Sequence, residues 1–296
     1  MCKGKNLSIR VNKCYLCDNE DFDIVHEGVR DNQDINVLKC LKCGLVQLDT
    51  HKENDYEFYE NSGMRKYGDT DFRSVRITAM ADDERRFNMF KSSLANKSVL
   101  DFGCGAGGFI HRADNICKFV DGIEPEKLMR DQLSKEGVTC FSSSEAAKRA
   151  KKKYDIITFF HVIEHLDDPI SELGGVRDLL KDKGKIIIEV PNCDDALLSL
   201  YNSKAFADFT YWSCHLYLYS DRTLTVMVRR AGYKVNFIKQ IQRYPLSNTL
   251  YWLSKGEPGG HVYWNMMNDM NLDKEYGELL SRLGCADTIV AEIEPS

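Results

Sequence analysis

The chain has 296 residues, of which 43% are hydrophobic and 29% charged, a composition typical of a globular protein. Its formal net charge of −5 excludes a strongly basic surface of the kind that holds nucleic acid or an anionic membrane. No apolar stretch reaches the roughly 18 residues of a membrane-spanning helix, and the N-terminal residues lack the apolar core of a signal peptide, so we expect a cytoplasmic protein.

Four cysteines near the N-terminus form two C-x-x-C pairs, Cys14 with Cys17 and Cys40 with Cys43, separated by 22 residues. Each pair makes a tight turn that presents two thiolates, and two such pairs can complete a tetrahedron around zinc with Zn–S bonds of about 2.3 Å. Because four thiolates leave no coordination position open, we expect a structural zinc ion within a zinc ribbon over residues 1–50. A [4Fe–4S] cluster and four unliganded thiols are the alternatives.

Zinc ribbons often bind nucleic acid, which is a polyanion. Residues 1–50 contain seven Lys and Arg against eight Asp and Glu, so this segment lacks a basic footprint. We therefore do not expect nucleic acid as a partner.

The following segment, residues 51–96, is polar with scattered aromatic side chains, and residues 74–94 have the pattern of a helix. We expect a helical N-terminal lid segment here, ahead of a main domain over residues 97–296. The aromatic residues of 56–67 and of 244–264 are candidates for a sugar-stacking lid, although aromatic residues belong more often to a core.

From residue 97 onward, short β-rich runs alternate with amphipathic helical segments. We expect strands at 98–103, 119–124, 138–141, 155–160 and 185–190. We expect helices at 126–137 and at 170–184, the second ending at Gly184 as its C-cap. This alternation is typical of a parallel, doubly wound sheet with right-handed crossovers.

The alternation loosens in the C-terminal third of the chain. Residues 220–233 predict a helix with Ser220 as its N-cap, and residues 233–240 and 287–295 predict strands. The insertion between these strands, about 242–286, carries three aromatic clusters. Because so long a connection is unusual in a compact domain, we expect it to be a lid or a binding element.

The stretch VLDFGCGAGGF, residues 99–109, contains two overlapping glycine motifs. A glycine turn between a buried strand and a helix lets the backbone approach a ligand, which suits a nicotinamide dinucleotide and S-adenosylmethionine alike. The dinucleotide motif G-x-G-x-x-G uses Gly103, Gly105 and Gly108, whereas the S-adenosylmethionine motif D-x-G-x-G-x-G uses Asp101, Gly103, Gly105 and Gly107.

Asp101 favours S-adenosylmethionine, because a carboxylate suits its ammonium and sulfonium charges and would repel a pyrophosphate. Glu124 lies 19 residues after Gly105, where an acid can accept hydrogen bonds from both ribose hydroxyls of either cofactor. The alternatives are a nicotinamide oxidoreductase, a non-catalytic scaffold whose glycine turn holds no ligand, and, for Glu124, an ordinary surface acid.

The motifs VLDFGCGAGGF, GIEP, YDIITFFHVIEHLDDP and GKIIIEVPN resemble, in order and spacing, those of class I S-adenosylmethionine-dependent methyltransferases over about residues 97–192. RTLTVMVRRAGY and DTIVAEIEP extend the resemblance to the sixth and seventh strands. It implies a Rossmann-like seven-stranded sheet whose antiparallel last strand is inserted beside the sixth, with S-adenosylmethionine as cofactor and S-adenosylhomocysteine as product. It also implies cofactor contacts from Asp101, Gly103, Gly105 and Gly107 on the methionine side, Glu124 on the ribose, Phe141 and Ser142 near the adenine, and Phe160 and His161 at the reactive end.

The motifs C-x-L-C and K-C-x-x-C-G-L-V, followed by EHLDDP and VPN, resemble the zinc-ribbon methyltransferases of deoxysugar and surface-polysaccharide biosynthesis. This resemblance implies a small polar acceptor, a sugar or a polysaccharide precursor, methylated on a hydroxyl. The larger members are sugar C-methyltransferases with a further C-terminal nucleotide-sugar domain that we do not expect here, so C- or N-methylation is an alternative. An RNA methyltransferase with an N-terminal zinc module is another, although its cysteine and histidine spacing is shorter.

Methyl transfer to a hydroxyl requires alignment of the acceptor and removal of its proton, and histidine suits proton removal near neutral pH. His165, after the fourth strand, and His215, in YWSCHLYLYS, are the candidate catalytic bases. Each has a structural alternative: a hydrogen bond that fixes its loop for His165, and burial under aromatic residues for His215. Tyr211, Tyr217 and His261 are weaker candidates.

Residues 161–165 also match H-x-x-E-H, an inverted zinc-protease motif. That motif needs a helix with both histidines on one face, whereas here His161 leaves a strand and residues 167–169 soon turn the chain, so we exclude a protease. Glu164 and His165 could still bind a divalent ion with a third ligand that the sequence does not identify.

Overall fold

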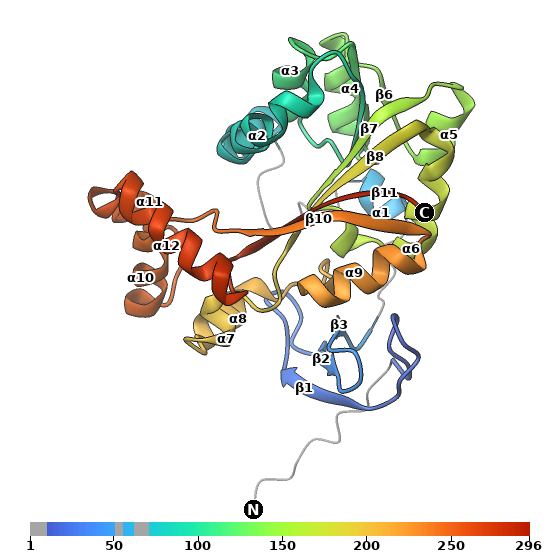
Figure 1. Ribbon diagram of the computed structural model, residues 1–296. Helices are drawn as coiled ribbons and strands as arrows, with labels where there is room; N and C mark the ends of the chain where they lie inside the picture. Colours follow the sequence, from blue (N-terminus) through green and yellow to red (C-terminus); the bar gives the residue numbers. More distant parts are fainter. Residues whose placement is uncertain (1–10, 51–55, 62–70) are drawn as a thin grey trace, which may run out of the picture.

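The structure is a computed structural model that describes residues 11–50, 56–61 and 71–296 (Figure 1). Part of the expected N-terminal lid, residues 51–55 and 62–70, lies outside the described residues. Within the described ranges, no helix combines the length and the apolar character that crossing a membrane requires.

Seven strands form one sheet in the order β10-β11-β8-β7-β4-β5-β6. The last strand, β11, pairs antiparallel with both β10 and β8, whereas β8, β7, β4, β5 and β6 pair in parallel. The expected Rossmann-like sheet with an inserted antiparallel last strand is confirmed. Its strands are β4 (Ser98–Phe102), β5 (Phe119–Ile123), β6 (Cys140–Phe141), β7 (Tyr154–Phe160), β8 (Leu180–Pro191), β10 (Tyr233–Ile241) and β11 (Thr288–Pro295).

Helices cover both faces of this sheet (Figure 1), because successive residues of the central strands point to opposite faces and both sets are apolar. Val99 and Ile156 pack toward α2 and α3, whereas Leu100 and Ile157 pack toward α5, α6 and α9. The helices are α2 (Phe72–Leu94), α3 (Gly108–Asp114), α4 (Lys127–Lys135), α5 (Ser144–Arg149), α6 (Pro169–Val176) and α9 (Asp221–Arg230).

Side-chain caps explain where two predicted helices begin. The carboxylate of Asp71 accepts hydrogen bonds from the backbone of Arg73 and Ser74, so α2 begins slightly earlier than its apolar pattern suggests. Ser220 is the N-cap of α9, as predicted, and forms a capping box with Thr223.

The helix predicted over 170–184 is wrong in its second half. α6 ends at Val176, and after one 3-10 turn β8 begins at Leu180. A Cβ on Gly184 would lie 2.9 Å from the Lys181 carbonyl oxygen, so glycine allows an irregular start of the strand here and does not cap a helix.

The insertion between β10 and β11 is helical and lies beyond one end of the sheet, next to two short helices that follow β8 (Figure 1). Aromatic side chains hold the two groups together, since the rings of Phe206 and Phe209 each lie 5.2 Å from Trp252. The helices are α7 (Ala196–Ser199), α8 (Lys204–Thr210), α10 (Leu246–Lys255), α11 (Gly260–Tyr263) and α12 (Met270–Leu283).

The N-terminal residues form a second, four-stranded antiparallel sheet in the order β1-β2-β3-β9. The fourth strand, β9 (Tyr217–Leu218), comes from far along the chain, between β8 and α9. One hydrophobic core joins this sheet to the main sheet. The first three strands are β1 (Phe22–His26), β2 (Val37–Cys40) and β3 (Val46–Leu48).

Candidate functional site

A cavity of about 350 Å³ lies at the carboxyl ends of β4 and β7. The strand order reverses between these two strands, and doubly wound sheets bind their ligands at such a point. The walls include Gly105, Glu124, His161 and His165. Tyr59, from α1 (Tyr56–Glu60), also lines the cavity, and its hydroxyl donates a hydrogen bond to the His165 carbonyl oxygen at 3.0 Å.

The three glycines of the loop after β4 all have positive φ angles, 70° at Gly103, 53° at Gly105 and 70° at Gly107. A Cβ on Gly103 would lie 2.5 Å from Val162, and one on Gly107 would lie 2.4 Å from Leu133, so a larger residue would displace these side chains in addition to the strain of a positive φ angle. A Cβ on Gly105 would meet no described atom within 4 Å. Gly105 is therefore the glycine at which the backbone leaves room for a ligand.

Glu124 is buried at the edge of this cavity and holds its glycine loop. Its Oε2 accepts a hydrogen bond from the Gly105 backbone at 2.8 Å, and its Oε1 accepts one from the Glu126 backbone at 2.9 Å. The structure therefore brings Glu124 and Gly105 together, and the predicted contact of Glu124 with a ribose stays a prediction.

Asp101 belongs to β4, the strand that ends at the cavity. It is 3% exposed and accepts a hydrogen bond from the Thr158 hydroxyl at 2.6 Å. Burial raises the pKa of Asp101 to about 7. Asp101 is not among the described residues that line the cavity, so its predicted contact with the cofactor stays a prediction.

Four other predicted cofactor residues do not belong to the cavity wall that the described residues form: Gly107, Phe141, Ser142 and Phe160. The side chain of Phe160 lies on the face of the sheet that α2 and α3 cover. It packs there against Phe109, with ring centroids 5.0 Å apart. The Phe141 carbonyl oxygen accepts a hydrogen bond from the Glu124 backbone at 2.9 Å, so Phe141 borders the site through its backbone.

A second cavity, of about 300 Å³, lies between the end of β8, helix α8 and the insertion. Its walls combine aromatic side chains, Phe206, Phe209 and Trp252, with polar ones such as Asp195 and Asn248. The insertion thus supplies one wall of a cavity. His161 lines both cavities, so the two meet at this residue.

The two candidate bases come together where the cavities meet. His165 lines the first cavity and His215 the second, with ring centroids 4.8 Å apart. His165 Nδ1 donates a hydrogen bond to the Cys214 carbonyl oxygen at 2.7 Å, which leaves Nε2 with a free lone pair. Burial lowers the pKa of His165 and lowers that of His215 to about 3, so both rings are neutral near pH 7.

The weaker candidates lie in different places. His261 lines the second cavity. Tyr211 packs against His26, with ring centroids 5.2 Å apart, and the Tyr217 hydroxyl donates a hydrogen bond to the Asp167 carbonyl oxygen at 3.0 Å. Both tyrosines therefore help to join the N-terminal sheet to the main domain.

The fold places a third candidate metal ligand, which the sequence did not identify, beside Glu164 and His165. The side chain of Glu164 is fully buried, and its Oε1 accepts a hydrogen bond from His161 Nδ1 at 3.1 Å. Ligand atoms of Glu164, His165 and His215 all lie within 4.8 Å of one another. Residue 215 is distant in sequence, so only the fold brings it into this group.

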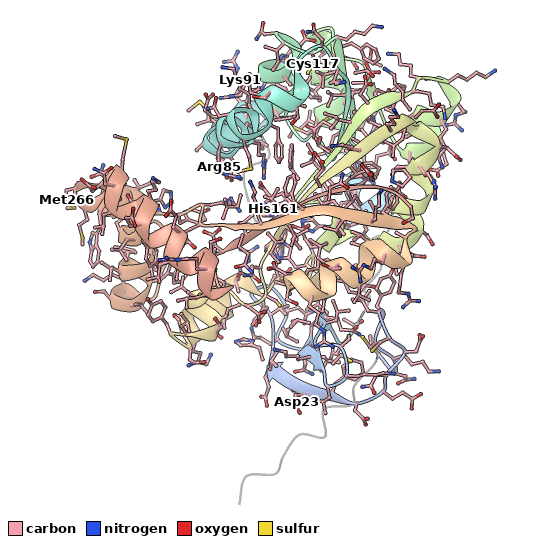
Figure 2. All side chains as sticks on the ribbon, viewed as in Figure 1. Asp23, Arg85, Lys91, Cys117, His161 and Met266 are labelled. Atoms are coloured by element: carbon pink, nitrogen blue, oxygen red, sulfur yellow. The ribbon has the colours of Figure 1, made fainter. Side chains whose placement is uncertain are left out.

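Glu189, at the end of β8, is the centre of a charged network that sequence reasoning missed. Its fully buried carboxylate accepts hydrogen bonds from Arg85 at 2.8 and 3.0 Å and from Arg86 at 2.9 Å. Its Oε1 also lies 3.3 Å from His161 Nε2. Figure 2 shows Arg85 and His161 in the region between α2 and β10. Two features of the sequence could have predicted this network: an acid, Glu189, within an apolar strand, and two adjacent arginines, Arg85 and Arg86, on a predicted helix.

Arg243, at the start of the insertion, joins this network to the second cavity. It donates to His161 Nε2 at 3.0 Å and to Asp82 Oδ1 at 3.0 Å, and its backbone donates to Asp287 at 2.9 Å. The Arg243 charge is therefore balanced by Asp82 and Asp287, and the orientation of the His161 ring is fixed.

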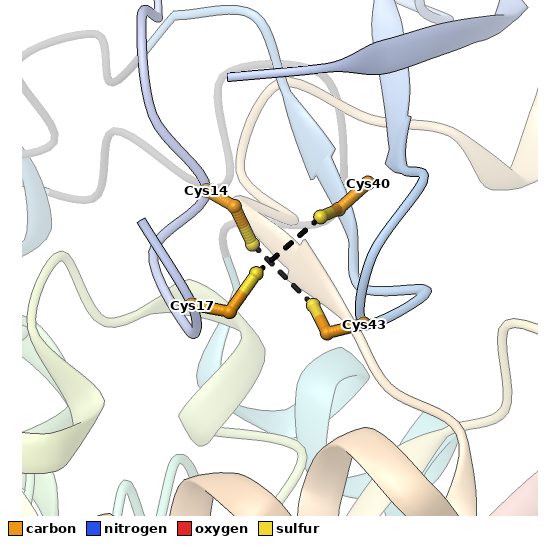
Figure 3. Close-up of side chains that lie close together, drawn as sticks. All are labelled: Cys14, Cys17, Cys40 and Cys43. Carbon is orange, nitrogen blue, oxygen red and sulfur yellow. Dashed lines mark hydrogen bonds between the residues drawn. The ribbon is translucent and has the colours of Figure 1, made fainter. Parts of the chain in front are cut away.

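The four N-terminal cysteines point toward one another (Figure 3). The Sγ atoms of Cys14 and Cys43 are 3.5 Å apart, as are those of Cys17 and Cys40, and all four lie within 4.8 Å of one another. Zn–S bonds of about 2.3 Å in a regular tetrahedron place the sulfur atoms about 3.8 Å apart. The residues present therefore fit a tetrahedral metal ion.

Known proteins similar to this chain are methyltransferases. An O-methyltransferase of ubiquinone biosynthesis from Aeromonas salmonicida is 28% identical over an alignment of 107 residues, and the match covers 33% of this chain and 45% of that protein. Its counterpart from Haemophilus ducreyi is 26% identical over 122 residues, 36% of this chain and 52% of that protein. The chain thus spans about half the length of these curated relatives.

Two solved structures are similar at lower identity. A SAM-dependent methyltransferase from Archaeoglobus fulgidus has 19% identity and a TM-score of 0.48, covering 75% of this chain and 95% of its own. Magnesium protoporphyrin IX methyltransferase from Synechocystis PCC 6803, with bound SAH, has 13% identity and a TM-score of 0.49, covering 81% and 98%. A family model described as a methyltransferase domain matches residues 72–236, more than half of the chain. The chain therefore belongs to the methyltransferase domain family.

Proposed function

We propose that the protein transfers a methyl group from S-adenosylmethionine to a hydroxyl of a small polar acceptor, a sugar or a surface-polysaccharide precursor. The observation that carries this proposal is the meeting of two cavities at His161. The cavity beside Gly105 and Glu124 holds the cofactor, and the cavity under the insertion holds the acceptor. The methyl donor and the hydroxyl then face each other near His165 and His215.

The walls of the second cavity support a sugar acceptor. Phe206, Phe209 and Trp252 offer flat apolar faces for the carbon–hydrogen face of a sugar ring, and Asp195 and Asn248 offer hydrogen-bond partners for its hydroxyls.

The aromatic walls of the second cavity also favour a second candidate, a phenolic acceptor. The curated relatives named above are O-methyltransferases of ubiquinone biosynthesis. A panel that contains both acceptor classes distinguishes them by S-adenosylhomocysteine release.

In the proposed reaction the acceptor oxygen attacks the methyl carbon, the carbon–sulfur bond breaks and S-adenosylhomocysteine leaves. The hydroxyl proton passes to a ring nitrogen of the pair formed by His165 and His215. Because the Cys214 carbonyl fixes the proton of His165 on Nδ1, its Nε2 is oriented to accept this proton. Arg243, which donates to Nε2, and Glu164, which accepts from Nδ1, fix the ring of His161 at the junction of the cavities.

We expect His165→Gln and His215→Gln each to lower turnover about 100-fold while the affinity for S-adenosylmethionine changes little. Turnover is measured as S-adenosylhomocysteine release and affinity by calorimetry. His111→Gln is the control. His111 lies on α3, is hydrogen-bonded to Glu136 at 2.7 Å and lines neither of the two cavities. Full turnover in both active-site variants would show that this pair does not accept the proton.

We also propose that the cysteine cluster holds a structural zinc ion that fixes the loop carrying His215. The N-terminal sheet is hydrogen-bonded to this loop directly, since the Leu48 backbone N–H donates to the Leu216 carbonyl oxygen at 3.1 Å. The Ser213 backbone and hydroxyl both donate to Asp31, at 3.0 and 2.6 Å. Folding of the ribbon and placement of His215 are therefore linked.

Cys40→Ser is expected to remove one zinc ion per chain and to lower the melting temperature, because a ribbon of this size depends on its metal for folding. Metal content is measured by mass spectrometry and melting by circular dichroism. The matched control is Cys117→Ser, whose thiol lies far from the ribbon (Figure 2). Equal zinc content in the two variants would rule out the proposed ligand set.

A further inference from the structure

We propose that Glu164, His165 and His215 bind a divalent transition-metal ion at the junction of the two cavities. Ligand atoms of the three residues lie within 4.8 Å of one another. Two imidazoles and one carboxylate form a ligand set that suits Zn²⁺, Mn²⁺ or Fe²⁺. This site is separate from the four-cysteine cluster of the ribbon.

Unsatisfied polar atoms point to a missing cation. Glu164 is fully buried, and its Oε2 has no hydrogen-bond partner among the described residues. His215 Nδ1 is buried and lacks a partner within the same part of the chain. Leaving such groups unpaired costs free energy, and a cation between them would satisfy both.

The remaining atoms have the partners that metal ligands commonly have. His165 Nδ1 donates to the Cys214 carbonyl oxygen, which directs the lone pair of Nε2 away from that backbone. Glu164 Oε1 is held by His161 Nδ1, which orients the carboxylate and leaves Oε2 for an ion. Metal–ligand bonds of about 2.1 Å place ligand atoms about 3.0 to 3.5 Å apart, so atoms now up to 4.8 Å apart would have to approach by up to roughly 1.3 to 1.8 Å.

The charges around the site permit a cation. On the side of His161, Asp82 and Asp287 balance the charge of Arg243. Arg30, whose charge acts on His215, lies over the Trp212 ring, 4.8 Å from its centroid. The two guanidinium groups of Arg85 and Arg86 are paired with Glu189. The carboxylate of Glu164 is therefore left to balance the charge of the ion.

The chemical role of this ion rests on the proposed function. Three protein ligands leave coordination positions open, and the second cavity delivers the acceptor hydroxyl to them. An ion lowers the pKa of a bound hydroxyl, so its proton passes to water, the new oxygen–carbon bond forms and the sulfur–carbon bond breaks. With the ion bound, the two histidines are its ligands, and the ion-bound hydroxyl loses its proton to water in place of the histidine base that the proposed function assigns to the metal-free protein.

A titration with manganese chloride tests the site in the full chain loaded with a single equivalent of zinc, which the four thiolates of the ribbon bind first. Mn²⁺ prefers oxygen and nitrogen ligands to thiolates, so the ribbon keeps its zinc. Electron paramagnetic resonance, which measures free Mn²⁺, is expected to show one bound ion per chain. Glu164→Gln and His215→Gln are expected to weaken this binding at least about ten-fold, with His111→Gln as the matched control.

Absence of Mn²⁺ binding in the unsubstituted chain, or equal binding in all three variants, would overturn the inference. His215→Gln keeps the test decisive if Glu164→Gln does not fold, because His215 lies on a loop. Calorimetry with S-adenosylmethionine separates this inference from the proposed function. Cofactor binding without Mn²⁺ binding refutes the ion alone, whereas Mn²⁺ binding without cofactor binding refutes the proposed function.

Discussion

Replacing Gly105 with asparagine is expected to lower the affinity for S-adenosylmethionine at least about 100-fold while the protein stays folded. Gly105 has a φ angle of 53°, which asparagine tolerates better than most residues. A Cβ here would meet no described atom within 4 Å, and Gly105 lines the cavity, so the rest of an asparagine side chain would extend into it. It would thus occupy the space that we assign to the cofactor, and calorimetry measures the loss.

The control for this substitution is Gly137→Asn. Gly137 also has a positive φ angle, 84°, and a Cβ on it would meet no described atom within 4 Å, but it follows α4 outside the cavity. We expect the cofactor affinity and the melting temperature of the Gly137→Asn variant to match those of the unsubstituted protein. Cofactor binding by Gly105→Asn as tight as by this control would mean that the cofactor occupies another cavity.

Removing the Glu189 carboxylate is expected to be the most destabilising single change, lowering the free energy of unfolding by about 3 to 5 kcal/mol in Glu189→Ala. The carboxylate is fully buried and pairs with Arg85 and Arg86. Its loss leaves two guanidinium groups without their shared partner, and one of them, Arg86, is itself buried. Urea denaturation followed by circular dichroism measures the change.

Glu292→Ala provides the comparison on the neighbouring strand β11. Glu292 pairs at 2.7 Å with Lys185, whose side chain is 41% exposed, so water can solvate this lysine once the carboxylate is lost. We expect this variant to lose about 1 kcal/mol or less. Equal losses in the two variants would show that the network around Glu189 contributes no particular stability.

Local patterns were sufficient for much of the fold. Apolar runs of strand length predicted β4, β5, β7 and β11 within a residue or two, because strands buried on both faces need continuous apolar side chains. The glycine loop and the cysteine pairs were equally visible, since φ angles and turn geometry depend on neighbouring residues. The helix predicted over 170–184 was wrong because its sequence also suited an early start of β8.

The sequence by itself determined the type of fold, the glycine loop around Gly105 and the four-cysteine cluster, because each depends on residues close together in the chain. Only the tertiary structure decided that β9 joins the N-terminal sheet and that His215 lies beside Glu164 and His165. It also decided which acid pairs with Arg85. These contacts join segments between 50 and 172 residues apart, and their energy depends on burial and geometry that arise only when the chain packs.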